Sequence, residues 1–316
     1  MLQSKGIPLQ LFQDHVIFGP NAVLKKDQQP YKIYTAYAKQ WKKQWALAKI
    51  KPYSSENFTS NFYQTKPFPG IGLTKLGFQS IPLPIPKAEM DIAVLKKYAE
   101  NRNFPSIQGT SRLGVHLRFG TISIRNLALL ASQSSPIFLN ELIWREFFCQ
   151  ILYHFPHVVH EPFRTMFQNM PWRDSKEDFE RWCQGQTGYP MVDAGMRELN
   201  QTGYMHNRVR MITASFLTKH LLLPWQWGES YFKQKLLDYE LSSNNGNWQW
   251  SAGCGCDAAP YFRIFNPTLQ QKKFDPKLSY VQTWVPEVFT QQYAKEIVNH
   301  SQASMRALRA YAKIKA

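Results

Sequence analysis

The sequence is poor in cysteine and has no long apolar run. Its 316 residues include four Cys, too few for a disulfide framework in so long a chain. Cys254 and Cys256 lie close together but have no His pair nearby, so we expect reduced, buried thiols and no metal. No apolar run reaches the roughly 18 residues that cross a membrane, and the first residues lack the layout of a signal peptide. We therefore expect a cytoplasmic protein with no membrane partner.

Acidic residues are also scarce. The chain has 22 Asp and Glu against 38 Lys and Arg, which gives a formal charge of +16. Such an excess suits a polyanion, and DNA or RNA is the usual candidate. Part of the excess is simply solvated surface, as in residues 39–51. The 10 Trp strengthen the nucleic-acid interpretation, because many stand beside Arg or Asn, and aromatic faces among cations suit base stacking.

Strand patterns are nearly absent. Residues 15–18 predict one short strand that ends in a turn at 19–21, and the sequence offers it no partner. Residues 31–45 alternate aromatic and basic side chains at mixed helical spacing. The stretch 52–86 is rich in Pro, Gly, Ser and Asn, which predicts an ordered but irregular linker.

From residue 87 onward the patterns are almost wholly helical. Apolar residues recur at spacings of three and four, and Gly, Pro or Asn separates the segments. The segments with this pattern are 88–102, 123–131, 138–155, 178–184, 191–203, 208–223, 229–243 and 302–315. The second part of the chain is therefore expected to be an all-helical domain.

Residues 110–114 gather hydroxyls and free backbone amides where a helix is expected to begin. Such a helix start attracts phosphate. From these residues alone, an ordinary capped helix is the favoured interpretation.

Residues 141–148 place an unusual set of side chains on one helix face. The spacing i, i+3, i+4 and i+7 aligns Glu141, Trp144, Arg145 and Phe148. A carboxylate, an indole and a guanidinium together are not typical of a core stripe. Glu141 and Arg145 alone could form a weak surface ion pair, but with Trp144 between them a wall that faces a ligand is at least as good an interpretation.

Residues 206–211 open another predicted helix. Asn207 and Met211 lie one turn apart, and Arg210 stands beside Met211. An amide for base edges, a soft thioether and cations suit a nucleobase wall. A helix end with solvated arginines is an equal alternative.

Residues 244–250 contain three Asn and one Gly, which predict a sharp turn. In such a turn Trp248 and Trp250 would point to different sides. The segment 257–267 mixes Pro, aromatics and Arg, which suits either a binding loop or a rigid packed loop.

Taken in order, these motifs resemble the DNA photolyase/cryptochrome family, most closely its class I cyclobutane pyrimidine dimer (deoxyribodipyrimidine) photolyases, over about residues 31–287. The segments that carry the resemblance are TSRL at 110–113, NELIWREF at 140–147, TGYPMVDAGMREL at 187–199, MHNRVRM at 205–211, NNGNWQW at 244–250 and DAAPYFRIFNP at 257–267. The resemblance implies a mainly α fold. Its parts would be a remnant of an N-terminal α/β antenna domain at 1–28, an interdomain linker at 29–86 and a helical FAD-binding catalytic domain at 87–316.

The resemblance also implies a cofactor and a reaction. Reduced, anionic FAD would absorb light, pass an electron to a pyrimidine dimer in UV-damaged DNA, and recover it after the cyclobutane bonds split. No metal is required. The residues that match cofactor-binding positions are Tyr98, Thr110, Ser111, Arg112, Leu113, Gly114, Arg210, Asp238, Tyr239, Glu240 and Asn244. Among them, Arg210 would neutralise nearby acid and Asn244 would sit at the flavin N5.

Lesion recognition is implied in the same way. The residues that match positions receiving a flipped-out dimer or holding DNA phosphates are Arg102, Glu141, Trp144, Arg145, Asn207, Arg208, Met211 and Trp250. The expected catalytic set is Glu141, Asn207, Asn244 and the electron-transfer chain Trp172, Trp225 and Trp248. Asn207 and Met211 match the cyclobutane-dimer pattern, whereas relatives that repair the (6-4) photoproduct carry His there. For each Trp alone, core packing is the ordinary alternative.

The chain departs from the family at several positions. Gly114 replaces a Ser, Glu240 replaces an Asp, Tyr239 stands where a small residue is usual, and most of the antenna domain and a C-terminal loop are missing. We expect no antenna pigment in this chain alone, and a monomer. Four interpretations stay open: a working photolyase, a cryptochrome-like flavoprotein that binds DNA without repair, a fragment that needs a separate N-terminal antenna chain, and a helical DNA-binding protein without enzyme activity.

Overall fold

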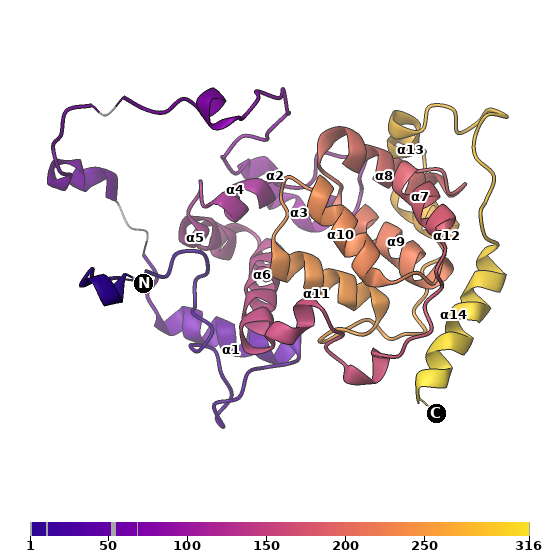
Figure 1. The fold of residues 1–316 in the computed structure, drawn as a ribbon, viewed down its shortest axis with the longest axis horizontal. Helices are drawn as coiled ribbons and strands as arrows, with labels where there is room; N and C mark the ends of the chain where they lie inside the picture. The colour runs from indigo at the N-terminus through magenta and orange to yellow at the C-terminus, as the bar shows by residue number, and fades with distance from the viewer. Residues whose placement is uncertain (1, 11, 52–54, 68, 316) are drawn as a thin grey trace.

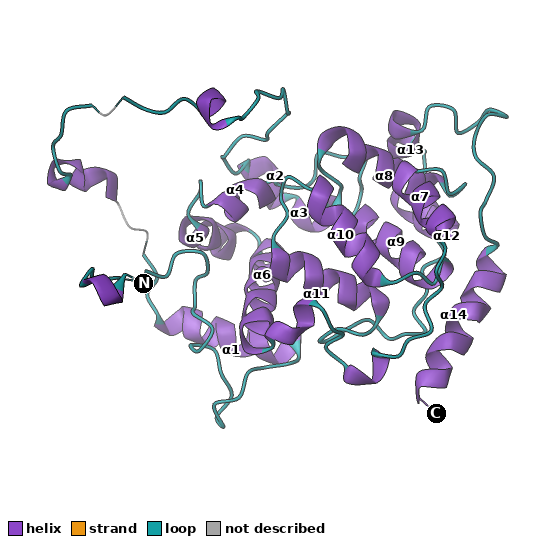
Figure 2. Cartoon of the chain, viewed as in Figure 1, coloured by secondary structure: helices purple, strands orange, loops and turns teal. Residues whose placement is uncertain are grey.

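The computed structural model describes residues 2–10, 12–51, 55–67 and 69–315. These residues are mostly helical and include no strand, apart from one isolated antiparallel bridge between Leu24 and Pro30 (Figures 1 and 2). The predicted mainly α fold is confirmed. Among the described helices, none is both long and apolar enough to span a bilayer.

Most of the helices follow one another after residue 90. Their bounds are α1 Tyr34–Leu47, α2 Ile92–Lys96, α3 Tyr98–Asn101, α4 Gly114–Phe119, α5 Ile124–Ser134, α6 Pro136–His154, α7 Lys176–Gln184, α8 Pro190–Thr202, α9 Asn207–Ser215, α10 Trp225–Lys235, α11 Leu241–Ala252, α12 Pro267–Phe274, α13 Ser279–Trp284 and α14 His300–Lys315. A π-helical turn, Phe216–His220, continues α9. Short 3-10 turns complete the set: Gln3–Lys5, Ser55–Asn61, Leu73–Leu76, Pro156–Val159 and Thr165–Phe167.

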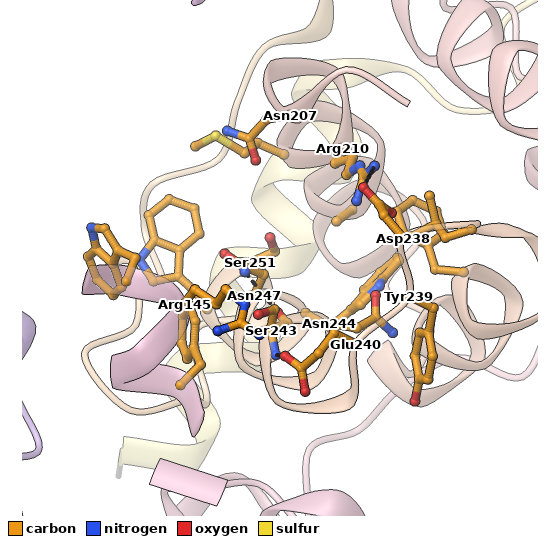
Figure 3. A pocket seen from close by; sticks show the side chains of 18 of the residues that line it. Arg145, Asn207, Arg210, Asp238, Tyr239, Glu240, Ser243, Asn244, Asn247 and Ser251 are labelled. Atoms are coloured by element: carbon orange, nitrogen blue, oxygen red, sulfur yellow. Dashed lines mark hydrogen bonds and ion pairs between the residues drawn. The ribbon is translucent and has the colours of Figure 1, made fainter. Parts of the chain in front are cut away.

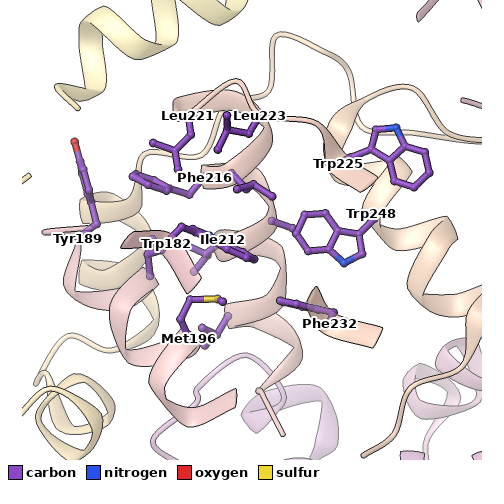
Figure 4. Packing of buried hydrophobic residues seen from close by; sticks show 14 of the residues in the cluster. Trp182, Tyr189, Met196, Ile212, Phe216, Leu221, Leu223, Trp225, Phe232 and Trp248 are labelled. Carbon is purple, nitrogen blue, oxygen red and sulfur yellow. The ribbon is translucent and has the colours of Figure 1, made fainter. Parts of the chain in front are cut away.

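Two clusters of buried apolar side chains hold the helices together. One is built around α1, α5 and α6, with Trp41, Ile143 and Phe147 fully buried in it. The other is built from α7 to α14, with Trp182 and Phe216 at its centre (Figure 4). Helices α6 and α11 pack against each other. The two cores therefore meet where these two helices meet.

The stretch expected to be an irregular linker has little regular structure. The residues described between 55 and 86 form only the two short turns Ser55–Asn61 and Leu73–Leu76, and Figure 1 shows them as a long strap away from the helices. Residues 52–54 and 68 of this predicted linker lie outside the described residues. Helix α1, also expected within the linker, packs against α6. The domain boundaries themselves stay predictions.

The strand predicted at residues 15–18 is wrong, because this segment forms bends. Its backbone N–H groups are held by a side chain instead of a neighbouring strand. The buried carboxylate of Glu146 on α6 accepts from Ile17 N at 2.7 Å and from Phe18 N at 3.2 Å. An apolar run without a strand partner satisfies its donors in this way.

The sharp turn predicted at residues 244–250 is also wrong, because these residues form the middle of α11. Glu240 caps the helix, accepting from Ser242 N and Ser243 N at 2.9 Å each. Gly246 is needed for close packing, since a Cβ there would lie 2.2 Å from the ring of Phe148. Capping and tertiary packing outweigh the turn preference of Asn and Gly. The sequence predicts one continuous helix over 229–243. It is interrupted between α10 and α11, because Glu240 caps the start of a new helix there.

Candidate functional site

A pocket of about 360 Å³ opens where α6, α9 and α11 meet (Figure 3). The side chains that line it come from these helices, from α10, and from the segments beside them. They are Arg102, Glu141, Trp144, Arg145, Phe148, Asn207, Arg210, Met211, Ala214, Phe232, Leu236, Asp238, Tyr239, Glu240, Ser243, Asn244, Asn247, Trp248, Trp250 and Ser251. Most of the candidate residues named from the sequence are in this set.

Helix α6 contributes the predicted face, since Glu141, Trp144, Arg145 and Phe148 all line the pocket. Glu141 Oε1 forms an ion pair with Arg102 Nη1 at 2.5 Å, and both side chains are partly exposed. Arg102, expected to hold a DNA phosphate, is thus paired with the carboxylate expected to contact the lesion.

One face of Trp144 is covered. The ring of Tyr34 stacks on it with centroids 3.6 Å apart and planes 5° from parallel. The Tyr34 hydroxyl donates to the carbonyl of Asn140 at 2.9 Å, one turn earlier on α6. A base that stacks on Trp144 therefore has only the opposite face of the indole available.

Arg145 also has an internal partner. Its Nη1 donates to the carbonyl of His15 at 2.8 Å, and its Nη2 lies 2.9 Å from Nε2 of the same residue. Burial and the charge of Arg145 lower the pKa of His15. Arg145, expected to bind a DNA phosphate, therefore anchors the N-terminal segment to α6 in this structure.

Helix α9 begins at the predicted point. His206 is its N-cap, and its Nδ1 accepts from Arg208 N at 3.1 Å. Burial and the neighbouring charge of Arg210 lower the pKa of His206 to about 4, so the ring is neutral and able to accept. Asn207 and Met211 then both face the pocket, as predicted.

The expected pairing of Arg210 with a nearby acid is present. Arg210 Nη2 lies 2.9 Å from Asp238 Oδ2. Burial alone would lower the pKa of Arg210, but the Asp238 carboxylate outweighs this effect and raises it. The other oxygen, Oδ1, is buried and has no hydrogen-bond partner among the described residues. Since buried polar atoms are rarely left unpaired, Asp238 is suited to accept an N–H from a ligand.

The start of α11 completes the pocket. The side-chain amide of Asn244 donates to Glu229 Oε1 at 2.9 Å. Glu240 lines the pocket and is the N-cap of α11. Its carboxylate accepts hydrogen bonds from the first turn of that helix, and these bonds outweigh burial and lower the pKa of Glu240. Trp248 and Trp250 also line the pocket, although helical geometry separates their side chains.

The TSRL segment lies beside the pocket without lining it. Thr110 contacts the hydroxyl of Tyr204 at 3.2 Å, and the guanidinium of Arg112 lies over the Tyr204 ring. Gly114, the next residue, packs closely against the pocket-lining Asp238: a Cβ at Gly114 would lie 2.8 Å from Asp238 Oδ2. Of the other expected cofactor residues outside the lining, Ser111 and Leu113 belong to this segment, and Tyr98 packs edge-on against Phe138.

Three further candidates also lie outside the lining. Trp225 is buried in the second core, and Figure 4 labels it together with Trp248. Trp172 is partly buried and meets Tyr311 edge-on at 6.3 Å. Arg208 is turned toward Asn103, to which its Nη2 donates at 2.6 Å.

Sequence reasoning missed the partners that fix these side chains. No local pattern reveals these partners, because each contacts a residue at least 15 positions away in the chain. They are Tyr34, Glu229, Tyr204 and Glu146. The pocket-lining Asn247 lies inside the segment predicted as a turn, and the pocket-lining Ser243 directly precedes that segment. A helical interpretation of that segment would have placed Asn247 beside both Ser243 and Asn244, at spacings of four and three residues.

Comparison with known proteins gives the family. Residues 138–289 match the FAD binding domain of DNA photolyase, and residues 1–55 match a DNA photolyase model. A deoxyribodipyrimidine photo-lyase of Escherichia coli (strain K12) is 38% identical over 97% of this chain and 73% of that protein. A class III photolyase from Agrobacterium tumefaciens has a TM-score of 0.79 and 35% identity, covering 99% of this chain and 75% of its own. An archaeal photolyase from Sulfolobus tokodaii, solved with two FAD molecules, has a TM-score of 0.77 and 30% identity, covering 99% and 73%.

The pocket and these matches define a helical flavin-binding protein. The chain belongs to the DNA photolyase/cryptochrome family and contains its FAD-binding domain. The residues present fit the cofactor: Asp238 offers a buried unpaired acceptor, Arg210 a cation, and the walls combine amides with indoles. Membership of class I within the family stays a prediction.

Proposed function

We propose that this chain uses reduced FAD and light to repair cyclobutane pyrimidine dimers in DNA, as a deoxyribodipyrimidine photo-lyase. The observation that carries the proposal is the two-sided pocket. Residues expected to hold the flavin, Asp238 and Asn244, line the same cavity as residues expected to hold the lesion, Glu141, Trp144 and Asn207. Electron transfer over a short distance needs this arrangement.

The residues on one side would hold the cofactor. When bound, FAD supplies a photoexcited electron donor. Asp238 would accept an N–H of the ring through its unpaired Oδ1, while its Oδ2 pairs with Arg210 at 2.9 Å. Asn244 would present its amide carbonyl, since its NH₂ is directed to Glu229. The aromatic lining excludes water from the reacting centre.

The residues on the other side would hold the dimer. A flipped base would stack on the free face of Trp144 and on Trp250, which offsets an unstacking cost of a few kcal/mol. Asn207 and Met211 would contact base edges, and Glu141 would steady the charge that develops on the dimer. Arg102, Arg145 and Arg208 would add phosphate contacts, and the +16 charge would make binding salt-dependent.

The three Trp form the proposed route for electrons from the surface to the flavin. Trp248 lines the pocket, Trp225 is buried in the same core cluster as Trp248, and Trp172 is partly exposed. Replacing Trp225 by Phe is expected to block light-driven reduction of the flavin while leaving its binding unchanged. The ordinary role of a buried indole, packing, would affect stability instead.

The experiment has two stages. The visible absorption spectrum of the purified chain first reports bound FAD, added if necessary. The reduced protein is then illuminated with an oligonucleotide that contains one thymine dimer, and repair is followed by the recovery of thymine absorbance, with a dark sample as control. Flavin with repair supports the proposal. Flavin and DNA binding without repair indicates a cryptochrome-like protein, and no flavin indicates a DNA-binding protein only.

The proposal includes a monomer that works in the cytoplasm and holds no antenna pigment by itself. All four Cys are unpaired thiols, which suits a reducing compartment. Light scattering measures the mass, and the absorption spectrum would reveal a second pigment. A dimer, or a second chromophore in stoichiometric amount, would contradict this part.

A further inference from the structure

Three side chains with metal-binding atoms converge at the edge of the pocket. His15 comes from the N-terminal segment, Cys149 from α6 and Glu240 from the start of α11, and their ligand atoms all lie within 4.8 Å of one another. These positions are far apart in the sequence, so no spacing motif announces them. An imidazole nitrogen, a thiolate and a carboxylate are ligands that zinc takes in proteins.

The distances are close to those a metal requires. Tetrahedral zinc has bonds of about 2.0–2.3 Å, so its ligand atoms stand about 3.5 Å apart. The three atoms would have to approach by little more than about 1 Å, which rotation about side-chain bonds supplies. Three protein ligands leave a fourth position for water or a phosphate oxygen.

Each of the three ligand residues has a hydrogen bond to a neighbouring residue. The carbonyl of His15 accepts from Arg145 at 2.8 Å, which fixes the backbone next to α6. Glu240 is fixed by the backbone N–H groups it caps. The hydroxyl of Ser242 lies 2.6 Å from Glu240 Oε2 and 3.2 Å from Cys149 Sγ, so it links two of the donors. Hydrogen-bonded neighbours of this kind orient metal ligands.

Charge is the main obstacle, because Arg145 Nη2 lies 2.9 Å from Nε2 of His15. Metal binding removes the thiol proton. The thiolate of Cys149 and the carboxylate of Glu240 then balance a divalent cation, and Arg145 faces a cluster without net charge. Arg145 also keeps its separate bond to the His15 carbonyl when the ring turns toward the metal.

We propose that His15, Cys149 and Glu240 form a binding site for a zinc-like divalent cation that ties the N-terminal segment to α6 and α11. Residues 15–18 have no strand partner, and the metal would supply a cross-link across the seam between the two cores. The site does not depend on the proposed repair activity, because no step of it requires flavin or DNA.

The test measures zinc in the 316-residue chain. The protein is incubated with zinc chloride, passed into metal-free buffer and analysed by mass spectrometry for zinc, with flavin content measured in the same sample. We expect about one zinc ion per chain, and its loss in Cys149→Ser and in His15→Ala. The matched controls Cys183→Ser and His160→Ala, whose residues lie outside the cluster, should retain it.

A second measurement distinguishes loss of the metal site from misfolding of a variant. Cobalt(II) added to the unmodified chain should give a thiolate-to-cobalt charge-transfer band that is absent from Cys149→Ser, while circular dichroism shows both proteins folded. Zinc should also raise the thermal midpoint of the unmodified chain and leave that of the two variants unchanged. Zinc that persists in both variants, or no zinc and no cobalt band in the unmodified chain, overturns the proposal.

Discussion

The side-chain amide of Asn244 is oriented by Glu229, to which its Nδ2 donates a hydrogen bond of 2.9 Å. A carboxylate only accepts hydrogen bonds, so the NH₂ group must face α10. The amide carbonyl of Asn244 is then turned away from Glu229. One contact between α10 and the first turn of α11 thus decides which end of this pocket-lining amide a ligand meets.

Replacing Glu229 by Gln is expected to release this orientation. The free energy of unfolding should fall by about 1 kcal/mol, because a hydrogen bond to a charged acceptor becomes a weaker one to a neutral amide. In a chain that also carries Asn244→Ala, the same replacement should cost clearly less, because the partner is gone. Chemical denaturation of the four proteins measures the coupling. Equal losses in both backgrounds would contradict the pairing, and Glu180→Gln on exposed α7 is the control.

Replacing Glu141 by Ala is expected to reduce repair more than binding. The carboxylate would act on the charged dimer, so the repair yield per bound dimer should fall by roughly tenfold or more. The affinity for dimer-containing DNA should change little, because the variant frees Arg102 to bind phosphate. Binding titrations and light-dose repair curves separate the two effects. An unchanged yield per bound dimer would eliminate this role for Glu141.

Glu146 is expected to make stability depend on pH. Burial raises the pKa of this carboxyl to about 7 from an ordinary 4.5, although Trp41 and the N-terminal backbone donate to it. A raised carboxyl pKa means that the folded chain keeps a proton the unfolded chain has lost. Its contribution is therefore present below pH 4.5 and is lost as the pH rises through 7, by about 3 kcal/mol in total.

The comparison with Glu146→Gln isolates this contribution, since other groups titrate in the same range. The free energy of unfolding of the unmodified chain, relative to the variant, should decrease as the pH rises from 4.5 to 7. Denaturation at several pH values measures it. Glu100→Gln, at an exposed position on α3, should show no such trend. A constant difference between the two proteins would show that Glu146 keeps an ordinary pKa.

Much of the site could be predicted from the sequence, because its residues repeat at helical spacing. Glu141, Trp144 and Arg145 follow this rule on α6, and the resemblance to the family adds the residues near Asp238. Local composition failed where distant contacts decide the structure. Residues 244–250 look like a turn, yet Asn245 donates to the carbonyl of Val158 across 87 positions and stabilises a helix. The residues next to an aromatic or charged side chain in the sequence do not show whether its ring is covered or its charge is paired. The stacking of Tyr34 on Trp144 is an example.

Replacing Gly114 by Ser is expected to weaken the flavin site, although Ser is the residue that the resemblance to the family implies there. In this chain a Cβ at Gly114 would lie 2.8 Å from Asp238 Oδ2 and 3.0 Å from Asp238 Cβ. The same Oδ2 binds Arg210 at 2.9 Å, so Asp238 cannot move aside without losing its ion pair. Overpacking of this kind costs about 1–3 kcal/mol. We expect a lower thermal midpoint and weaker binding of FAD.

Fluorescence titration with FAD and thermal denaturation of the flavin-free chain measure the two effects. Gly72→Ser is the matched control, because nothing lies within 4 Å of a Cβ at that position. If the clash governs, shortening the acid should relieve the contact with Oδ2, so Asp238→Ala should lower the stability cost of Gly114→Ser while leaving FAD binding weak. Tighter FAD binding in Gly114→Ser would instead mean that the added hydroxyl reaches the cofactor and that Asp238 has room to move.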